Sequence, residues 1–436
     1  MTCGGNRLLH AQRLPVDEGL IKQQRRLAKI FNHTTALTAT NPRFRIVELK
    51  AKTEQIVTAL LDWFAANARD LPWRRTHDPY AIWVSEIMLQ QTQVKTVIPY
   101  WDRWMRELPT IAAAANASSD QLHKLWEGLG YYTRVRNLQK AAQVVLEKHG
   151  GKFPQHFDAV LALPGIGRYT AGAICSIAFN QPMPILDGNV IRVVTRLFGL
   201  AENPKAKNAN AKLWKIAEEL VAHAKTQRRQ ANNSPVRTFA ASRRDNSCSF
   251  LNQSLMELGA LICAPRNAQC RICPANQLCV AFKENRVAEL PNLGKREVAT
   301  TRRFVAFALE WNGKFLIQQR PSGVVNAHLW EFPNLEVTGG KSDTQAAFKT
   351  LFSAKPEVIQ PLATVKHSIT RYRVTLEAFL VRLTKTRSPS SPLKILTCGT
   401  RLSPRWLEPH EFDSVAFSSA HKKLASAAAK SILSNR

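Results

Sequence analysis

Acidic residues are scarce in this chain. Its 436 residues include 32 Asp and Glu against 61 Lys and Arg, which gives a formal net charge of +29 and a pI near 10.2. Such an excess of positive charge is typical of proteins that bind a polyanion, because neutralising phosphates and releasing their counterions favours binding without any base being read. A basic solvated surface, basic tails on a neutral core and an anionic membrane surface are the alternatives.

Long apolar runs are also missing. The sequence contains no run of about 18 apolar residues, the length that is needed to span a bilayer. It also contains no segment with the features of a secretory signal. The hydrophobic fraction of 45% is ordinary for globular proteins, and 436 residues suffice for two or three domains. The sequence therefore predicts a multidomain protein with no membrane span.

Cysteine is sparse outside one short segment. Four of the 8 cysteines follow the spacing C-x6-C-x2-C-x5-C, at Cys263, Cys270, Cys273 and Cys279. Four thiolates this close can hold a metal or an iron–sulfur cluster. A zinc site usually has two close Cys pairs with a longer loop between them, whereas only Cys270 and Cys273 form a close pair here. The asymmetry favours a [4Fe–4S] cluster; zinc and plain thiols are the alternatives, and a disulfide framework fits poorly.

The apolar pattern along the chain indicates a largely helical first region, residues 51–282. Apolar residues recur at helical spacing from Glu54 onward. Further helices are expected at 82–100, 119–126, 136–149, 158–163, 190–197 and 251–262. A polar, basic stretch at 225–249 interrupts this pattern and is interpreted as a mobile insertion.

The second region, residues 302–436, has a different character and is expected to be an α+β domain. Two extended runs flank Asn312-Gly313, which is a strong signal for a type I′ hairpin. Residues 372–383 form another strand candidate. A polar linker, residues 283–301, is expected to separate the two domains.

The N-terminal extension, residues 1–50, is basic and carries few acids. Within it, residues 20–31 are candidates for a short basic helix. The extension is open to interpretation as a targeting peptide, an unstructured tail or an upstream start codon read into the chain. Because no convincing address is present, a bacterial cytoplasm is expected, with mitochondrial and nuclear locations as alternatives.

A glycine-containing turn between two helical segments reads Leu-Pro-Gly-Ile-Gly-Arg. Gly165 and Gly167 permit a tight turn with exposed backbone N–H groups, and Arg168 opens the next helix. Such donors at a helix start can cradle a phosphate. Gly-x-Gly alone is weak evidence, but in this basic chain the helix–hairpin–helix pattern favours binding to a nucleic-acid backbone.

Two carboxylates stand in settings suited to chemistry. Glu86 is surrounded by apolar residues on a predicted helix, where burial would raise its pKa and suit it to general acid catalysis. Asp187 follows an apolar run and precedes a helix. A surface ion pair for Glu86 and a plain N-cap for Asp187 are the alternatives, although an Asp in this position can do both jobs.

Two further residues are candidates for contact with bases. Gln91 lies in the polar run 90–93, which could place amides in a groove or a base stack. Tyr131 lies on the Gly-flanked turn GLGYY, where an aromatic ring can wedge into or stack on bases. Ordinary packing is the alternative for Tyr131.

Taken together and in order, SEIMLQQTQV, GLGYY, LPGIGRYTAG, LDGNV and the four-cysteine loop closely resemble the MutY family of adenine DNA glycosylases. The likeness covers roughly residues 54–436. It implies a mostly α helix–hairpin–helix glycosylase domain with a [4Fe–4S] loop, followed by an α+β Nudix-like domain. It also implies a monomer that flips adenine out of A:8-oxoguanine or A:G mispairs in double-stranded DNA and hydrolyses the N-glycosidic bond.

The resemblance implies roles for individual residues. Glu86 matches the acid that protonates adenine and handles the water, and Asp187 matches the carboxylate that stabilises the oxocarbenium-like sugar. Asn189 matches a residue that supports Asp187 and the sugar. Gln91 and Tyr131 match residues that wedge into the stack around the lesion.

Tyr169 separates this chain from its nearest relatives. It matches an active-site residue near the adenosine, whereas bifunctional members of the endonuclease III family carry there the Lys that acts as Schiff-base nucleophile. A monofunctional glycosylase is therefore expected. An endonuclease III-like bifunctional glycosylase/lyase and a non-catalytic iron–sulfur DNA-binding protein are the alternatives.

The Nudix-like region implies lesion reading without hydrolysis. Residues 334–356 contain only Glu336 and Asp343 as acids, whereas a Mg²⁺-dependent pyrophosphatase needs several. The lesion-reading loop of the family falls at 367–371. Its usual Phe-Ser-His appears here as Ile-Thr-Arg, so that Thr370 retains the hydroxyl expected to contact the lesion.

Overall fold

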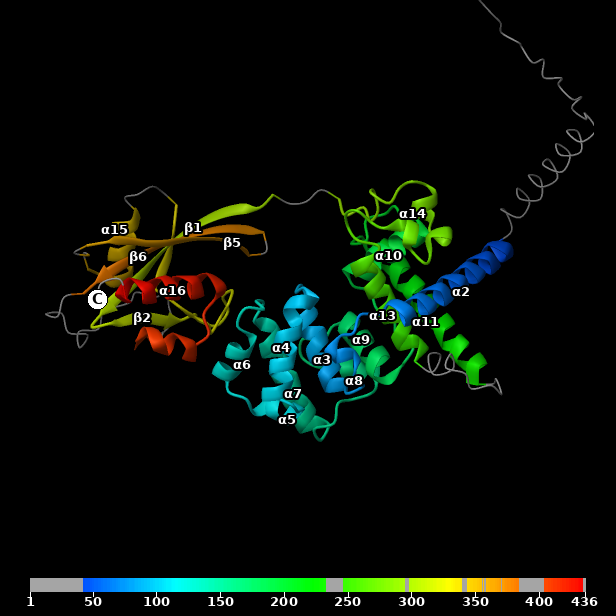
Figure 1. Ribbon diagram of the computed structural model, residues 1–436, viewed down its shortest axis with the longest axis horizontal. Helices are drawn as coiled ribbons and strands as arrows, with labels where there is room; N and C mark the ends of the chain where they lie inside the picture. The colour runs from blue at the N-terminus through cyan, green and yellow to red at the C-terminus, as the bar shows by residue number, and fades with distance from the viewer. Residues whose placement is uncertain are drawn as a thin grey trace, which may run out of the picture.

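The computed structural model describes residues 42–232, 246–294, 298–338, 343–354, 356, 358–369, 371–383 and 404–433. Two domains are visible in Figure 1: a helical domain formed by residues 42–294 and a sheet domain formed by residues 298–433. The expected basic helix at 20–31 and the residue Thr370 lie outside the described residues.

The helical domain confirms the predicted fold class for the first region. Its α-helices are α2 (Pro42–Asn67), α3 (Pro79–Leu89), α4 (Val94–Glu107), α5 (Ile111–Asn116), α6 (Ser119–Trp126), α7 (Thr133–Lys148), α8 (Phe157–Leu161), α9 (Arg168–Phe179), α10 (Gly188–Phe198), α11 (Lys207–Asn232), α13 (Ser247–Leu261) and α14 (Val280–Lys283). Short 3₁₀ turns lie at η1 (Pro72–Arg74), η2 (Cys270–Ile272) and η3 (Asn276–Leu278).

One predicted helix is in fact two. The chain leaves helical geometry between α3 and α4, where Gln91 has φ +58°. A non-glycine residue rarely adopts this conformation, so the turn needs support from elsewhere in the fold. The prediction of a continuous helix at 82–100 is therefore wrong, because the apolar pattern alone does not reveal such a turn.

Two predicted boundaries also differ from the structure. Helix α2 begins at Pro42, so helical structure starts before the expected end of the extension at residue 50. Helix α11 continues to Asn232 and α13 begins at Ser247, inside the stretch interpreted as an insertion. Only residues 233–246 separate these helices, and of these the structure describes Asn246 alone.

The helical domain has two apolar cores. One lies among α3, α4, α6 and α7 and contains Trp83, Trp104 and Trp126. The other lies among α2, α10, α11 and α13. Helix α9 touches α3 on one side and α13 on the other, so it connects the two halves. This arrangement leaves room for a site where the halves meet.

The predicted linker at 283–301 is partly packed. Leu290 is buried in the second core, and its carbonyl accepts a hydrogen bond from Arg196 Nε at 2.8 Å. At its other end, the first strand already begins at Thr300. The start of the predicted linker therefore belongs to the helical domain.

The sheet domain confirms the predicted α+β character of the second region. Its elements are β1 (Thr300–Trp311), β2 (Lys314–Gln319), β3 (Trp330–Glu331), β4 (Asn334–Val337), α15 (Asp343–Phe352), β5 (Gln360–Ile369), β6 (Tyr372–Arg382), β7 (Arg405–Leu407), η4 (Pro409–Ser414) and α16 (Ser419–Leu433). The strand order is β3-β2-β1-β6-β5, with β4 paired to β1 and β7 paired to β2. The predicted hairpin is present: Asn312 and Gly313 both have positive φ and join β1 to β2.

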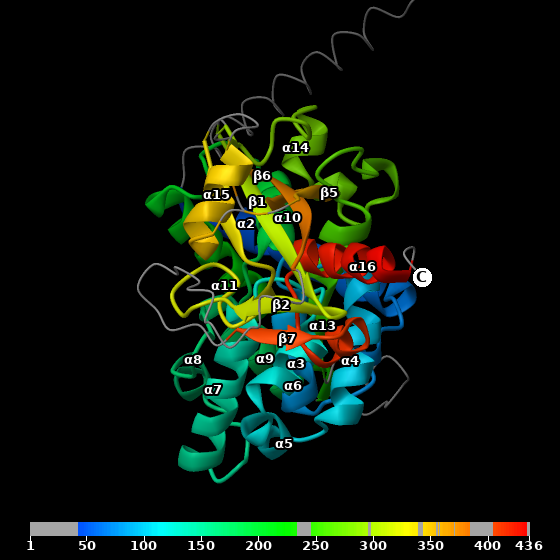
Figure 2. The ribbon, with the colours of Figure 1, turned by 90° about the vertical axis from the view of Figure 1, so that its left-hand side faces the viewer.

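One helix covers each face of the sheet (Figure 2). Alternate residues of β1 point to opposite sides, as a strand with both faces buried requires. Val305, Phe307 and Leu309 pack with α15, whereas Ala306 and Ala308 belong to the core that includes α16.

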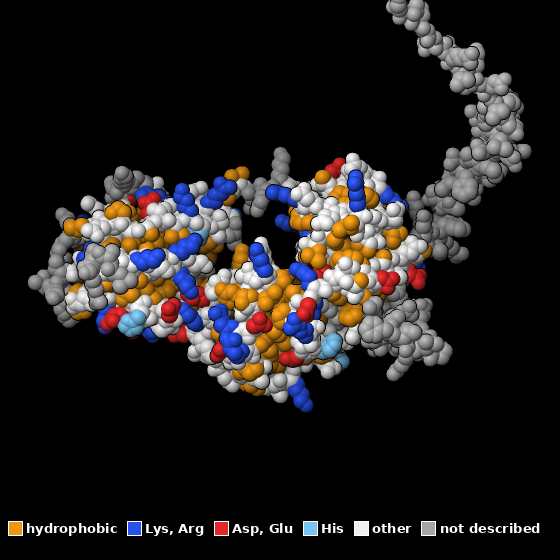
Figure 3. Space-filling view, viewed as in Figure 1, with side chains coloured by type: hydrophobic (Ala, Val, Ile, Leu, Met, Phe, Trp, Pro, Cys, Tyr) orange, Lys and Arg blue, Asp and Glu red, His pale blue; other side chains and the backbone are white. Residues whose placement is uncertain are grey.

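The two domains touch at the corner between α6 and α7. Glu127, which is buried at the end of α6, accepts hydrogen bonds from Phe417 N–H at 3.1 Å and from Lys422 Nζ at 2.5 Å. The rings of His123 and His328 stack nearby, with centroids 6.4 Å apart. Figure 3 shows a hollow between the domains with Lys and Arg side chains on its border. Within the described ranges, no helix has the length and apolar character to cross a membrane.

Candidate active site

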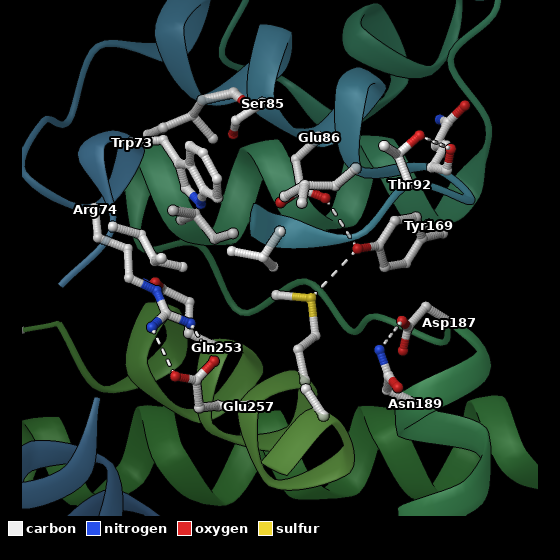
Figure 4. Close-up of a pocket in the computed structure, with 18 of the residues that line it drawn as sticks. Trp73, Arg74, Ser85, Glu86, Thr92, Tyr169, Asp187, Asn189, Gln253 and Glu257 are labelled. Atoms are coloured by element: carbon white, nitrogen blue, oxygen red, sulfur yellow. Dashed lines mark hydrogen bonds and ion pairs between the residues drawn. The ribbon is translucent and has the colours of Figure 1, made fainter. Parts of the chain in front are cut away.

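A cleft of about 530 Å³ opens where the two halves of the helical domain meet (Figure 4). Its walls come from η1, α3, the starts of α9 and α10, and α13. Five residues singled out from the sequence line it together: Glu86, Gln91, Tyr169, Asp187 and Asn189. They come from three separate stretches of the chain, 86–91, 169 and 187–189, and the fold brings them together.

Glu86 projects from α3 into the cleft and is only 5% exposed. Burial raises its pKa to about 7, because removal from water disfavours the charged form. A hydrogen bond from Tyr169 opposes this rise, and the negative charge of Asp187 adds to it. Near neutral pH, Glu86 can therefore give up a proton and take one back, as a general acid–base catalyst must.

Tyr169, the second residue of α9, sits beside this carboxyl group. Its hydroxyl is 2.9 Å from Glu86 Oε2 and 3.3 Å from Met256 Sδ, and it has one proton to donate between them. Burial, with the nearby carboxylates, holds the pKa of Tyr169 well above its usual range. The residue is therefore a phenol donor and not an anion.

Asp187 is the N-cap of α10 and also a wall of the cleft. Its Oδ1 accepts from Val190 N–H at 2.7 Å, and its Oδ2 accepts from Asn189 Nδ2 at 3.0 Å. Burial raises the pKa of Asp187, while these hydrogen bonds oppose the rise by favouring the carboxylate. The N-cap interpretation is confirmed, and the same carboxylate lines the cleft, but a catalytic role for Asp187 stays a prediction.

An ion-pair cluster in the cleft was not predicted. Glu257 on α13 is buried between two guanidinium groups, with Arg69 Nη2 at 2.7 Å and Arg74 Nη2 at 3.0 Å from its Oε2. Burial alone would raise the pKa of Glu257, but the hydrogen bonds from both arginines lower it to about 2. A signal was present: like Glu86, Glu257 interrupts an apolar helix.

The helix–hairpin–helix turn is formed as predicted. Gly167 is the N-cap of α9, and Gly165 has φ +76°. A Cβ on Gly165 would lie 2.5 Å from Asn137 Cβ, so only glycine fits this position. The Arg168 guanidinium is engaged within the protein: it pairs with Glu218 at 2.8 Å and lies 3.8 Å from the centroid of the Trp214 ring. Contact between Arg168 and DNA stays a prediction.

Comparisons with known proteins show which families the chain matches. Residues 84–219 match the model of the HhH-GPD superfamily of base excision DNA repair proteins, and residues 305–427 match the NUDIX domain model. The adenine DNA glycosylase of Rattus norvegicus is 33% identical over 422 residues, which cover 84% of this chain and 76% of that protein. The Homo sapiens adenine DNA glycosylase is 32% identical, covering 84% and 72%. That of Buchnera aphidicola from Schizaphis graminum is 35% identical, covering 64% and 74%.

The chain belongs to the adenine DNA glycosylase family. Membership confirms the predicted family, the fold class of a helix–hairpin–helix domain followed by a Nudix-like domain, and the prediction that the protein is an enzyme of the DNA N-glycosylase class. The cleft with its two carboxylates lies within the helical half of this glycosylase.

The four cysteines of the glycosylase line one small apolar cavity beside α10. Among the described residues, no three His, Cys, Asp or Glu side chains form a group that could hold a single metal ion. Four thiols that line one cavity match the donor set of an iron–sulfur cluster.

Side chains of α10 connect this cysteine loop to the cleft. Arg196 Nη1 donates to Cys263 Sγ at 3.3 Å, and Arg192 Nε donates to the Cys263 carbonyl at 2.7 Å. Arg192 Nη2 also donates to Asn189 Oδ1 at 2.9 Å. Asn189 in turn donates to the Asp187 carboxylate, so three successive contacts join the cysteine loop to Asp187.

The two residues predicted to wedge into DNA share an unusual backbone. Gln91 and Tyr131 have φ +58° and +48°, and each occupies a loop between helices. Gln91 is exposed at the rim of the cleft, and Tyr131 is 45% exposed. The structure therefore leaves both side chains available to a ligand.

Proposed function

We propose that this glycosylase removes adenine from A:8-oxoguanine and A:G mispairs in double-stranded DNA, acts as a monomer and leaves an abasic site. The observation that carries the proposal is that Glu86 and Asp187 line one cleft in different settings. Glu86 titrates near neutrality, whereas the carboxylate of Asp187 is held by two hydrogen bonds. One carboxyl group that can donate a proton and one carboxylate that is held in place by hydrogen bonds are suited to breaking a glycosidic bond.

In the first step, Glu86 gives its proton to a ring nitrogen of the extruded adenine. The N-glycosidic bond then breaks, and its electron pair leaves with the base. Protonation makes adenine a better leaving group, and general acid–base catalysis of this kind contributes roughly 10²–10⁴-fold. Tyr169 positions the Glu86 carboxyl group through its hydrogen bond.

In the second step, the positive charge left on the sugar faces Asp187. Asn189 and the N-terminus of α10 fix the orientation of this carboxylate. A water molecule adds to the sugar carbon, and the Glu86 carboxylate accepts the proton that the water loses. The products are free adenine and an abasic sugar, and Glu86 is again protonated for the next cycle.

The lyase reaction of bifunctional relatives is not proposed for this chain. The residue after Arg168 would supply the nucleophilic amine in that reaction. Here it is Tyr169, a phenol that stays protonated. Hydrolysis without strand cleavage follows.

DNA contacts are proposed on both sides of the hollow. The turn at Gly165 and Gly167 offers backbone N–H groups to phosphates, and Gln91 and Tyr131 enter the base stack. The sheet domain reads 8-oxoguanine, with Thr370 as the proposed contact. Residues 334–356 contain only Glu336 and Asp343 as acids, too few for metal-dependent hydrolysis, and Glu336 is paired with Arg302. We place the protein in a bacterial cytoplasm.

A [4Fe–4S] cluster is the proposed cofactor, held by Cys263, Cys270, Cys273 and Cys279. It would stabilise the loop that contacts α10 and would position DNA-facing backbone, with no part in the bond-breaking step. Purified protein should contain about four irons per chain. Full activity in colourless, zinc-loaded protein would reject this cofactor.

One assay separates the candidate activities. Labelled duplexes carry adenine opposite 8-oxoguanine, adenine opposite guanine or an oxidised pyrimidine, and each is treated with and without hot alkali. Alkali-dependent cleavage at the adenine supports the proposal. Borohydride trapping on the pyrimidine duplex would indicate a bifunctional lyase, and tight binding without cleavage would indicate a DNA-binding protein.

A further inference from the structure

The guanidinium of Arg134 lies between two loops that are distant in sequence. One is the 90–93 loop between α3 and α4, and the other is the 127–132 loop between α6 and α7. Arg134 Nη1 donates to the carbonyls of Ile87 at 2.9 Å, Met88 at 3.0 Å and Gln90 at 2.5 Å. Its Nη2 donates to the carbonyls of Leu129 at 3.0 Å and Gly130 at 3.1 Å.

These contacts supply hydrogen-bond donors to backbone carbonyls. The last carbonyls of a helix have no partner inside it, and a cation at that end is favourable. Arg134 satisfies carbonyls at the end of α3 and ties them to the second loop. Its guanidinium also lies over the rings of Trp126 and Tyr131, 5.4 and 5.6 Å from their centroids. The side chain is thus held on several sides.

Two of the bound carbonyls come directly before Gln91 and Tyr131 in the chain. The carbonyl of Gln90 belongs to the peptide unit that leads into Gln91, and that of Gly130 belongs to the unit that leads into Tyr131. Gln91 and Tyr131 have φ +58° and +48°, a conformation that non-glycine residues adopt only with support from their surroundings. One guanidinium therefore fixes the peptide unit in front of both residues.

We propose that Arg134 is a positioning residue that sets the spacing and orientation of Gln91 and Tyr131, so that both side chains enter the duplex as one unit while adenine is extruded. This inference rests on the proposed function, which assigns Gln91 and Tyr131 to the base stack. Lysine cannot replace Arg134, because a single ammonium group lacks the planar fork that reaches carbonyls on both loops.

The test is Arg134→Lys in the full-length protein, with Arg103→Lys as matched control. Arg103 also donates to a backbone carbonyl, that of Leu125 at 2.8 Å, and lies over an aromatic ring, that of Tyr100. Base extrusion is followed by stopped-flow fluorescence of 2-aminopurine placed beside the target adenine, opposite 8-oxoguanine. Extrusion should slow at least tenfold in Arg134→Lys and change less than twofold in Arg103→Lys.

Two readouts separate positioning from general damage. The pH dependence of excision is set by Glu86, so its midpoint should not move in Arg134→Lys. Combining Arg134→Lys with Tyr131→Ala should cost less than the product of the two single effects, because both changes disable the same unit. Full multiplication of the effects, or extrusion at the wild-type rate in Arg134→Lys, would overturn the inference.

A second variant keeps the inference testable if Arg134→Lys does not stay folded. If Arg134→Lys melts below the assay temperature, Gly130→Ala serves instead, since an added Cβ there meets nothing within 4 Å and acts only through φ +70°. It should slow extrusion in the same direction, and a wild-type rate would again overturn the inference. Failure of the proposed function looks different: the wild-type protein itself would extrude no adenine.

Discussion

The hydroxyl of Tyr169 donates a hydrogen bond to Glu86 Oε2 across 2.9 Å. This contact joins the residue that stands in place of a lyase amine to the residue that we propose as the proton donor. A hydrogen bond to a carboxylate favours its charged form, so Tyr169 lowers the pKa that burial has raised. Burial therefore raises the pKa of Glu86, the hydrogen bond from Tyr169 opposes this rise, and the charge of Asp187 adds to it.

Tyr169→Phe should move the pH profile of excision to higher pH. Without the hydrogen bond the Glu86 carboxylate is less stable, so the proton is retained to a higher pH. Hydrogen bonds to charged groups are worth about 1.5–3 kcal/mol, which corresponds to about one pH unit or more. Single-turnover rates between about pH 5 and pH 9 measure the shift. A descending limb that stays near pH 7 would show that Tyr169 does not act on Glu86.

Glu86→Gln should lose excision and gain stability. Loss of the proton donor should slow excision by at least roughly 10²–10⁴-fold. Since the pKa of folded Glu86 is raised from 4.5 to about 7, the wild type loses stability as pH rises through this range, and the amide does not. The gain in melting temperature should therefore be larger at about pH 8 than at about pH 5.

The control for this variant is Glu107→Gln, which changes an exposed carboxylate on α4. It should leave both excision and melting temperature unchanged. If Glu86→Gln stabilises the protein equally at both pH values, Glu86 is not the buried titrating group.

Asp187→Asn should separate charge from capping. Asparagine is as good an N-cap as aspartate, so Val190 N–H keeps its acceptor and the melting temperature should change little. Excision should fall steeply because the sugar cation loses its countercharge. Asp187→Ala, which also removes the cap, should cost a further roughly 0.5–2 kcal/mol of stability. Normal excision by Asp187→Asn would leave Asp187 as a helix cap only.

Glu127→Gln should loosen the contact between the domains. Glu127 is buried whereas Lys422 is half-exposed, and the substitution takes the acceptor charge away from both Lys422 and Phe417 N–H. The radius of gyration from small-angle scattering should rise, and the rate preference for A:8-oxoguanine over A:G should fall. Glu408→Gln removes the exposed pair with Lys314 and should change neither. An unchanged radius and preference would show that Glu127 does not hold the domains.

A structural feature could be predicted from the sequence when the residues that determine it lie close together in the chain. The hairpin at Asn312-Gly313 was predictable because two adjacent residues determine it. Glu86 and Asp187 stood out from their apolar neighbours, but only the resemblance to a known family gave them a shared role. Glu257 gave the same signal, but its meaning depends on Arg69, which lies 188 positions away in the chain. The turn at Gln91 was missed because its support, Arg134, is 44 positions from the Gln90 carbonyl it holds.

The most direct test is to measure the free adenine that the enzyme releases from a duplex with adenine opposite 8-oxoguanine. Under single-turnover conditions, with enzyme in excess, the wild type should release one adenine per duplex and leave a strand that breaks only after alkali. Glu86→Gln should bind the same duplex and release almost none. Release of another base, strand cleavage without alkali, or undiminished release by Glu86→Gln would contradict the account.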